Sequence, residues 1–251
     1  MCLVAIAWRA HPRYPLIIAG NRDELHARPT TPAAWWPDAP QVLGGRDEVA
    51  SGSWLAVSRR GRVAVVINDP RRPPGPARKA SRGHLVRDFV SGDRPGGRFL
   101  DSVAVNEYRY AGFCLLLGTR VQVRGFVTDR GGSPHRWTLR PGIAVFSNSP
   151  LDTPSPKVSF LEAALREILA AEHLDREQVF AMLGRREPVM AVPAGEPPYG
   201  HLPFIAGETY GTRASTLVVF DDAGGCAFEE RRFGPTGAPT GVSSEQFNLE
   251  T

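Results

Sequence analysis

The sequence predicts an α+β fold in which two stacked, mostly antiparallel sheets lie between layers of helices. Apolar strand patterns come in hairpins, helical patterns are interleaved with them, and several strands are apolar on both faces. The 251 residues suffice to bury a large core, and they contain no internal repeat and no linker that would split the chain. We therefore predict a single domain over residues 1–233 and a C-terminal tail over 234–251, rich in Pro and Gly and then polar, that is partly disordered.

Paired apolar runs predict three hairpins, and later single runs predict further strands. The first hairpin is buried on both faces, and the segment Asn21-Arg22-Asp23-Glu24 leaves its second strand. A Pro-rich loop containing Trp35 and Trp36 follows. Strands are expected at 3–8, 16–20, 53–58, 62–68, 111–119, 121–128, 142–147, 216–220 and 227–233.

Helices are expected at 82–90, 99–105, 155–172 and 175–183. The third is the clearest, because Ser155 is a good N-cap and Pro156 suits a first helical turn. Glu162 and Arg166 are spaced to pair on its exposed side. Its apolar face is predicted to comprise Val158, Leu161, Ala164, Leu165, Ile168 and Leu169.

Composition indicates an ordinary globular protein, with 42% hydrophobic and 22% charged residues. The net charge is +4, and the basic residues are nearly all Arg, with Lys only at 79 and 157. No basic motif interleaved with aromatic residues accompanies this charge, so we expect no nucleic-acid partner. The opening apolar run is too short for a signal peptide, and no run of about 18 apolar residues predicts a membrane span. We therefore expect a cytoplasmic protein.

Several common kinds of site are not indicated. The six histidines form no HxxH or HExxH pattern, so we expect no metal site. No GxGxxG, Walker or GxSxG sequence occurs, and we expect no cofactor. The pairs Gly96-Gly97, Gly131-Gly132 and Gly224-Gly225 are interpreted as turns. The odd cysteine count argues against a disulfide framework, and Cys114 and Cys226 lie in strand patterns typical of the core.

The remaining cysteine, Cys2, directly follows Met1. Cysteine is small enough to allow removal of the initiator methionine, and Cys2 would then carry a thiol and a free α-amino group. A thiol has an ordinary pKa of roughly 8.5, and an α-amino group is a base with a pKa of roughly 8. A nucleophile and a base in one residue are what N-terminal-nucleophile amide hydrolases use.

Further segments extend this pattern along the chain. Asn21-Arg22-Asp23-Glu24 follows Cys2 at a distance that resembles the signature of the NRDE family, also called the transport-and-Golgi-organisation family. The resemblance covers residues 2 to about 233. The other segments that carry it are Gly44-Gly45-Arg46-Asp47, Gly52-Ser53-Trp54-Leu55-Ala56-Val57, Ser81-Arg82-Gly83-His84-Leu85, Ser147-Asn148-Ser149-Pro150-Leu151-Asp152 and Tyr210-Gly211-Thr212-Arg213-Ala214-Ser215-Thr216.

The family is similar in layout to cysteine N-terminal-nucleophile hydrolases of the choloylglycine and penicillin-V acylase type. The resemblance implies a four-layer αββα sandwich of two mostly antiparallel sheets. It also implies Cys2 as the nucleophile, Asp23 as the carboxylate beside the α-amine, Asn68 and Asn148 near the oxyanion, and Arg213 near the nucleophile. Substrate contacts are expected from Asn21, Arg22, Trp54 and Arg71, with core packing as the alternative for Trp54.

The pattern departs from the acylases at one position. The acylases carry an Arg three residues before the Asp, and this chain has Gly20 there. Neighbouring residues of a strand point to opposite faces, so Arg22 is expected to face away from Asp23.

The site residues also have ordinary structural interpretations. Asp23 can cap a turn, and Asn68 and Asn148 precede turn-forming Pro-containing sequences. Arg213 can pair with Glu208 or Asp221. A basic stretch after Asn68 is either a solvated loop or a cationic rim that attracts an anionic ligand; it comprises Arg71, Arg72, Arg78, Lys79, Arg82 and Arg87.

Two functions follow from these residues. The first is hydrolysis of a non-peptide C–N amide bond with processed Cys2 as the nucleophile. The alternative is a non-catalytic binding or trafficking protein for haem or an acyl-lipid-like anionic ligand, with His26 as the one candidate for a haem ligand. Either function implies a small amphipathic or anionic molecule as partner, and the sequence leaves the oligomeric state open.

Overall fold

The computed structural model describes residues 2–75, 80–128, 135–148 and 155–250. These residues form thirteen β-strands and four α-helices. Contacts within the chain divide it into two compact units. The first unit combines the residues up to Ala27 with Pro141–Phe247, and the second contains Arg28–Arg140 and the residues from Asn248 onward.

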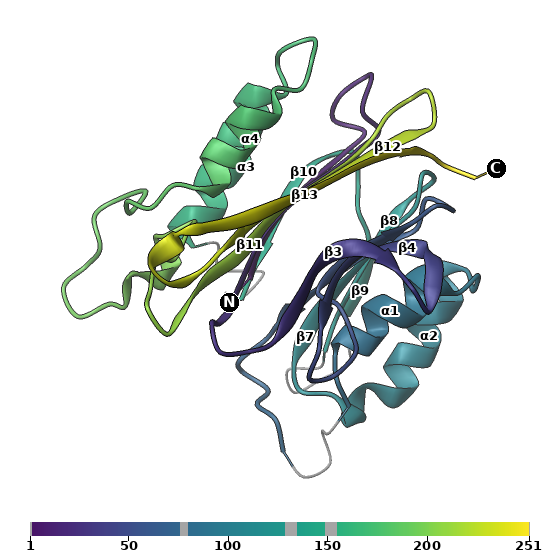
Figure 1. Cartoon of the computed structure of the whole chain (residues 1–251), viewed down its shortest axis with the longest axis horizontal. Helices are drawn as coiled ribbons and strands as arrows, with labels where there is room; N and C mark the ends of the chain where they lie inside the picture. Colours follow the sequence, from purple (N-terminus) through teal and green to yellow (C-terminus); the bar gives the residue numbers. More distant parts are fainter. Residues whose placement is uncertain (1, 76–79, 129–134, 149–154, 251) are drawn as a thin grey trace. The chain divides into compact units, whose positions relative to one another are not determined.

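The first unit is built on a six-stranded sheet with the strand order β10-β1-β2-β11-β12-β13 (Figure 1). The registers given for β10-β1, β1-β2, β2-β11 and β11-β12 are antiparallel. The first and last strands of the chain's fold therefore belong to one sheet. Its strands are β1 (Cys2–Trp8), β2 (Leu16–Leu25), β10 (Gly142–Ser147), β11 (Tyr210–Phe220), β12 (Gly225–Phe233) and β13 (Pro239–Asn248).

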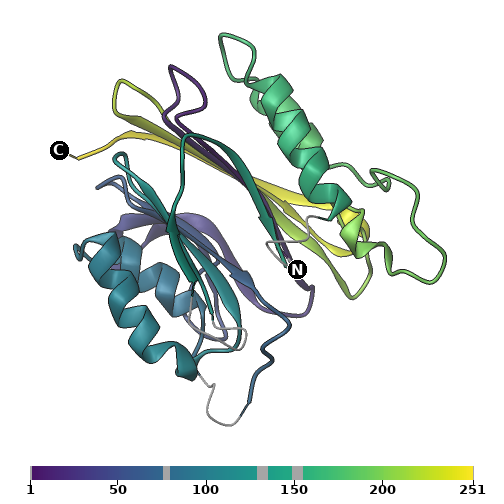
Figure 2. The same ribbon diagram turned by 180° about the vertical axis from the view of Figure 1, so that it is seen from behind.

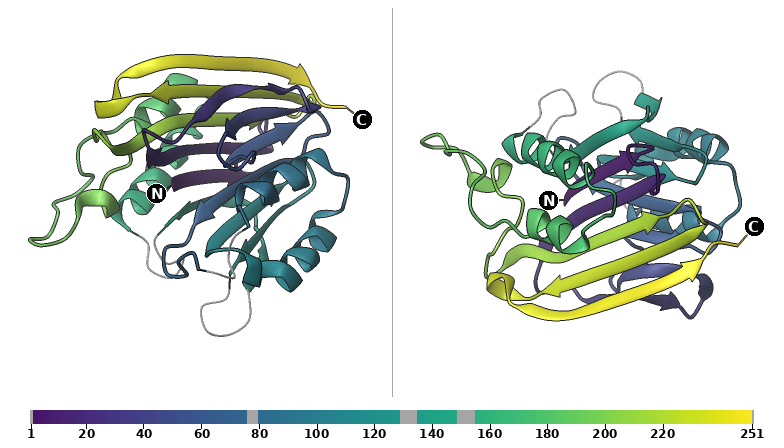
Figure 3. Two further views of the ribbon diagram at one scale, coloured as in Figure 1. Left: turned by 60° about the horizontal axis from the view of Figure 1, so that its bottom comes forward. Right: turned by 90° about the horizontal axis from the view of Figure 1, so that it is seen from above.

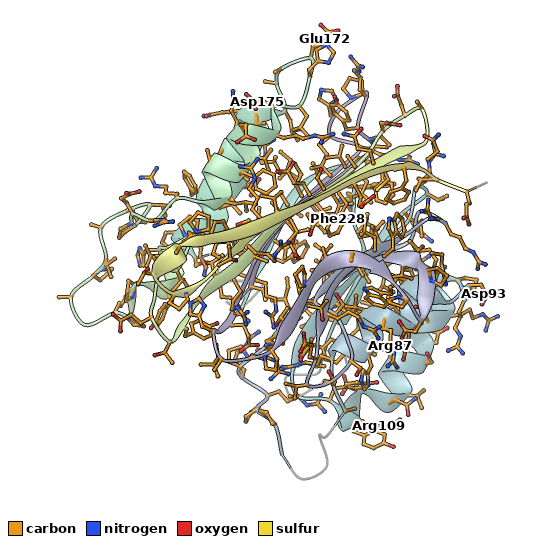
Figure 4. The ribbon with its side chains drawn as sticks, viewed as in Figure 1. Arg87, Asp93, Arg109, Glu172, Asp175 and Phe228 are labelled. Carbon is orange, nitrogen blue, oxygen red and sulfur yellow. The ribbon has the colours of Figure 1, made fainter. Side chains whose placement is uncertain are left out.

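Two helices, α3 (Pro156–Ile168) and α4 (Arg176–Leu183), cover one face of this sheet (Figure 3). Side chains alternate across a strand, so every second residue of β1 and β2 faces the helices. Leu3, Ala5 and Ala7 of β1 are fully buried in this helix-facing core. Glu172 and Asp175 mark the turn that joins the two helices (Figure 4).

The second unit contains a seven-stranded sheet with the order β3-β4-β5-β6-β7-β8-β9. The helices α1 (Gly83–Ser91) and α2 (Gly96–Asn106) pack side by side on it (Figure 2). Their core includes Phe89, Phe113 and Phe126, which are fully buried. The strands are β3 (Thr30–Trp36), β4 (Ala39–Asp47), β5 (Leu55–Ser58), β6 (Val63–Asn68), β7 (Phe113–Gly118), β8 (Val123–Val127) and β9 (His135–Thr138).

The predicted α+β class with two antiparallel sheets is confirmed. All four predicted helices and all nine predicted strands are present, with ends that shift by a few residues. No helix among the described residues is long and apolar enough to cross a membrane. The interpretation of Gly131-Gly132 as a turn falls on residues outside the described ranges.

Three local predictions were wrong. The Pro-rich loop around Trp35 and Trp36 is in fact the β3–β4 hairpin, in which Trp36 Nε1 donates a hydrogen bond to the Gly44 carbonyl. Gly96-Gly97 begins α2 instead of forming a turn. Ser155 occupies the N-cap position of α3, but its side chain makes no capping hydrogen bond.

The C-terminal segment also differs from the prediction of a partly disordered tail. Pro235–Gly237 forms one 3₁₀ turn, and the following residues form β13, which extends the sheet of the first unit beyond β12. Most side chains of β13 are exposed, and Arg232 on β12 donates a hydrogen bond to Ser243 Oγ. The polar composition that suggested disorder is that of an exposed edge strand.

Candidate active site

The candidate active site lies where β1 begins, between β2 and β10. Cys2 is the Cα partner of Arg22 on β2, and Leu3 is the partner of Ser147 on β10. Asn148 directly follows β10, so the two antiparallel ladders bring it beside Cys2. The backbone nitrogen of Cys2 donates a hydrogen bond of 2.5 Å to Asn148 Oδ1. Both residues are buried.

The register places Cys2 and Arg22 on one face of the sheet and Asp23 on the other. Leu3 and Ala19 face the helices, and by alternation Asp23 shares that face. Arg22 points to the opposite face, the face that carries the Cys2 side chain. The strand register therefore places Arg22 and Asp23 on opposite faces of the sheet, as predicted. The same register sets a guanidinium directly across from the candidate nucleophile.

No cationic side chain fits at Gly20, three residues before Asp23. A Cβ atom at this position would lie 2.8 Å from the Leu3 carbonyl oxygen and 3.1 Å from a methyl group of Val4. The strand pair leaves no room for any side chain there. Arg22 is on the same face as Gly20, two residues closer to the strand end. Its guanidinium is buried and lies 3.9 Å from Glu24 Oε2.

The Cys2 thiol is held in its protonated form by its surroundings. Burial raises the pKa of this thiol above its ordinary value, and the negative charge of Asp23 raises it further. The amino-terminal charge of the chain, the Arg22 guanidinium and a hydrogen bond from the Asp23 backbone N–H lower the pKa but do not reverse the shift. A neutral thiol is a weak nucleophile, so this cysteine needs a base beside it to react.

Asp23 is a buried carboxylate whose orientation is fixed by a short hydrogen-bond chain. The Ile205 N–H donates to Thr212 Oγ1 at 2.9 Å, and Thr212 Oγ1 donates to Asp23 Oδ1 at 2.7 Å. Burial raises the pKa of Asp23 to about 6, and the lowering effects, largest first, come from the amino-terminal charge of the chain, the Thr212 hydrogen bond, the Lys157 charge and the Arg22 charge. The carboxylate is thus ionised at neutral pH, but by a small margin.

Lys157 is a member of this cluster that the sequence analysis did not identify. It lies in the first turn of α3, and only 2% of its surface is exposed. Burial lowers the pKa of its ammonium group, while Asp23 and, to a smaller extent, Cys2 raise it. One signal was available, because Lys157 precedes Leu161 by four residues and so stands on the apolar face of the helix.

Asn21 lies on the helix face and binds other parts of the chain. Its Nδ2 donates to the carbonyls of Leu183 at 2.8 Å and Pro203 at 2.9 Å, and its Oδ1 accepts from Ser215 Oγ at 2.6 Å. These bonds fasten the end of α4 and the segment near Pro203 to the sheet. The predicted substrate contact of Asn21 stays a prediction beside this structural role.

Arg213 lies at a β-bulge between Thr212 and Ala214, where the register of β11 against β2 shifts. A bulge redirects a side chain from the regular alternation. The Nη1 atom of Arg213 donates to the Leu25 carbonyl at 3.2 Å. Its predicted place near the nucleophile stays a prediction.

Three other predicted site residues belong to the second unit. Asn68 ends β6, as expected, Trp54 packs over Gly45, and Arg71 forms two hydrogen bonds of 2.8 Å to the carboxylate of buried Asp69. Their roles toward Cys2 stay predictions.

The basic stretch is largely engaged with the chain itself. Arg72 pairs with Glu107 at 3.0 Å, Arg82 donates to the Gly112 carbonyl, and Arg87 pairs with Asp88. Arg87 and Arg109 are seen on the second unit in Figure 4. Arg78 and Lys79 are outside the described residues, as are Met1 and the segment Ser149–Asp152.

His26, the candidate haem ligand, is bound to the backbone. Its Nε2 atom lies 3.1 Å from the Gly207 carbonyl oxygen, and its Nδ1 atom is buried. The role of His26 toward haem stays a prediction. In the part of the chain that the structure describes, no three His, Cys, Asp or Glu side chains gather as metal ligands.

The fold of this chain is similar to that of solved hydrolase structures. The structure matches a Caenorhabditis elegans N-acylethanolamine-hydrolyzing acid amidase ortholog with a TM-score of 0.55 and 12% identity, over 87% of this chain and 92% of the other. It matches the C2A mutant of conjugated bile acid hydrolase from Clostridium perfringens with a TM-score of 0.58 and 8% identity, over 100% of this chain and 94% of the other.

The chain belongs to the Transport and Golgi organisation 2 family, whose model matches residues 1–235. The mouse Transport and Golgi organization 2 homolog is 30% identical over 259 residues, covering 92% of each chain. The human homolog is 29% identical over 256 residues with the same coverage. The resemblance drawn from the Asn-Arg-Asp-Glu segment is thereby confirmed.

Proposed function

We propose that this protein hydrolyses a non-peptide amide bond, with Cys2 as an N-terminal nucleophile. The observation that carries the proposal is the bond between the Cys2 nitrogen and Asn148 Oδ1. It fixes the nitrogen that would become the α-amine once Met1 is removed. Arg22, the partner of Cys2 on β2, supplies a cation beside Cys2. Asp23, which follows Arg22 in the chain, supplies an anion.

The fold relatives support an acyl amide as the substrate class. One is named as an acid amidase that hydrolyses N-acylethanolamine, and another as a hydrolase of conjugated bile acids. Both names describe hydrolysis of amphipathic molecules. We therefore propose an amphipathic or anionic N-acyl compound as the substrate of this chain.

The proposed reaction begins with transfer of the thiol proton from Cys2 Sγ to its own α-amine. The thiolate attacks the acyl carbonyl carbon and forms a tetrahedral intermediate. When the C–N bond breaks, the leaving nitrogen takes the proton from the α-ammonium, and a thioester remains on Cys2. Water then gives a proton to the α-amine and attacks the thioester, which releases the carboxylic acid and restores the thiol.

Asn148 would stabilise both charges that form in this reaction, the α-ammonium and the oxyanion. Its Oδ1 accepts a hydrogen from the Cys2 nitrogen, which favours the ammonium form of the amine. Its Nδ2 is the atom able to donate to an oxyanion, and removal of one such donor costs about 10²–10³ in rate. Asn68 is proposed as a second donor, as the resemblance implies.

The proposal predicts that Cys2→Ala folds normally and loses all measurable turnover, because the thiol that attacks the acyl carbonyl is removed. Release of amine from a panel of N-acyl compounds measures turnover, and far-ultraviolet circular dichroism measures folding. Cys114→Ala is the matched control, since Cys114 is also a buried strand cysteine. It should retain turnover. Hydrolysis by Cys2→Ala at the rate of the unaltered protein would refute the proposal.

The same panel distinguishes the non-catalytic alternative. Saturable binding of an acyl-lipid-like anion or of haem, without hydrolysis by either the unaltered protein or Cys2→Ala, would support a binding or trafficking role. In that case substitution of a predicted substrate-binding residue such as Arg22, and not Cys2→Ala, should abolish binding.

A further inference from the structure

The site contains a buried lysine in a chain that hardly uses lysine. Of 30 Lys and Arg residues, only Lys79 and Lys157 are lysines. Lys157 is among the largest side chains in the molecule that are almost completely buried. Burying a cation is costly unless an anion or a hydrogen-bond network compensates it. Its position therefore calls for a specific counter-charge.

The fold directs Lys157 to the helix face of the sheet, where Asp23 lies. α3 packs on β10 and β1, and its buried residues contact the same face that carries Leu3 and Ala19. Asp23 is on this face by alternation from Ala19. Of the two groups that raise the pKa of Lys157, Asp23 has the larger effect and Cys2 the smaller.

The other charged groups near α3 leave Asp23 as its counter-ion. β10 contains no ionisable side chain, and the only one on β1 is Cys2. On α4, Arg176 is a like charge and Glu177 is exposed and bound by Arg231. On α3 itself, Glu162 pairs with Arg166, and Glu167 is exposed. On β2, Arg22 points to the face opposite Asp23, and Glu24 pairs with Arg22.

We propose that Lys157 is a positioning residue of this site, whose ammonium group keeps the buried Asp23 carboxylate ionised beside the Cys2 amine. This role rests on the proposed function, in which Asp23 stabilises the ammonium formed when the thiol loses its proton. Loss of Lys157 would raise the pKa of this buried carboxyl group, because its positive charge is one of those that lower it. A larger fraction of the carboxyl groups would then be protonated and would no longer attract the α-ammonium.

The choice of Lys over Arg fits this task. The guanidinium of Arg is planar and broad and needs several acceptors, whereas the Lys ammonium is a compact charge on a slender stem. A single carboxylate that already accepts a hydrogen bond from Thr212 can accommodate such a point charge. The surface salt bridges Arg46–Asp38 and Arg166–Glu162 use arginine.

The electrostatic interaction between Lys157 and Asp23 can be measured without turnover. In protein labelled with ¹⁵N-lysine only two Nζ signals exist, and Lys79→Arg assigns them. We expect the pKa of Lys157 to fall by about one pH unit or more in Asp23→Asn, because an attractive charge is lost. The matched control Glu167→Gln removes an exposed carboxylate from the same helix and should leave the titration unchanged. Identical Lys157 titrations in the unaltered protein and Asp23→Asn would overturn the inference.

A second measurement tests the effect on catalysis. Protonation of Asp23 should give kcat/KM an acidic limb, and Lys157→Met should move this limb upward by about one pH unit or more. Glu167→Gln should not move it. An unmoved limb in a folded Lys157→Met variant would overturn the positioning role. Absence of hydrolysis by the unaltered protein would instead defeat the proposed function, and the lysine titration would still decide whether Lys157 and Asp23 interact electrostatically.

Discussion

Opposing effects of its surroundings determine whether Asp23 is protonated. Burial favours its protonated form, whereas the Thr212 hydrogen bond and the Lys157 charge favour the carboxylate. The result is a pKa of about 6, so at neutral pH the carboxylate is charged at a cost to folding. The proposed function needs that charge, and the molecule is less stable because of it.

This cost predicts a pH-dependent stability difference between the unaltered protein and Asp23→Asn. Since the folded-state pKa is raised from 3.8 to about 6, the stabilising contribution of protonated Asp23 is complete below about pH 4 and is lost as the pH rises through about 6. The unaltered protein should lose roughly 3 kcal/mol relative to Asp23→Asn over the full titration range, of which about 2 kcal/mol falls between pH 4 and 6. Urea unfolding at pH 4, 5, 6 and 6.5 measures the difference. A difference that is independent of pH contradicts the assignment.

The sequence predicted which residues belong to the site better than it predicted which residues they contact. The resemblance implied Cys2 as the nucleophile and Asn148 near the oxyanion, and the structure joins the Cys2 nitrogen to Asn148 Oδ1 by a hydrogen bond. Lys157 was missed because a lone lysine is usually exposed, and only the packing of α3 on the sheet shows that it is buried. The pairing of Arg22 with Cys2 depends on strand register, which a single strand pattern does not specify.

Among the elements, the β1–β2 pair determines the site. The apolar runs predicted this hairpin correctly because both strands are buried on both faces. β3 and β9 were missed because each is an edge strand, and edge strands tolerate short length, polar residues and Pro. Pro32 lies within β3, where the alternating pattern of a central strand is absent.

The tight contact within this pair predicts the effect of Gly20→Ala. The added Cβ would meet the Leu3 carbonyl oxygen at 2.8 Å, so the strands must separate next to Cys2. We expect a loss of roughly 1–3 kcal/mol in the free energy of unfolding, together with reduced turnover. Gly200→Ala is the control, because its Cβ would have an ordinary contact of 3.8 Å with Ser155. Equal stability of both variants would contradict the geometry.

Across the whole molecule, the site of the first unit gathers segments that are distant in sequence. The nucleophile and Asp23 come from the first hairpin, Asn148 from the end of β10, Lys157 from the first turn of α3 and Thr212 from β11. The family resemblance covered the segments that contain Cys2, Asp23, Asn148 and Thr212, but it did not indicate Lys157. Their convergence depends on the strand order β10-β1-β2-β11, which follows from tertiary packing.

The most direct test of the central claim is the intact mass of the purified, untagged protein. The proposed mechanism requires the α-amine of Cys2 as the base, so we predict a mass lower than that of the full sequence by one methionine residue. Full retention of Met1 would leave the Cys2 nitrogen in a peptide bond, where it cannot accept the thiol proton. That result would contradict an N-terminal nucleophile at Cys2.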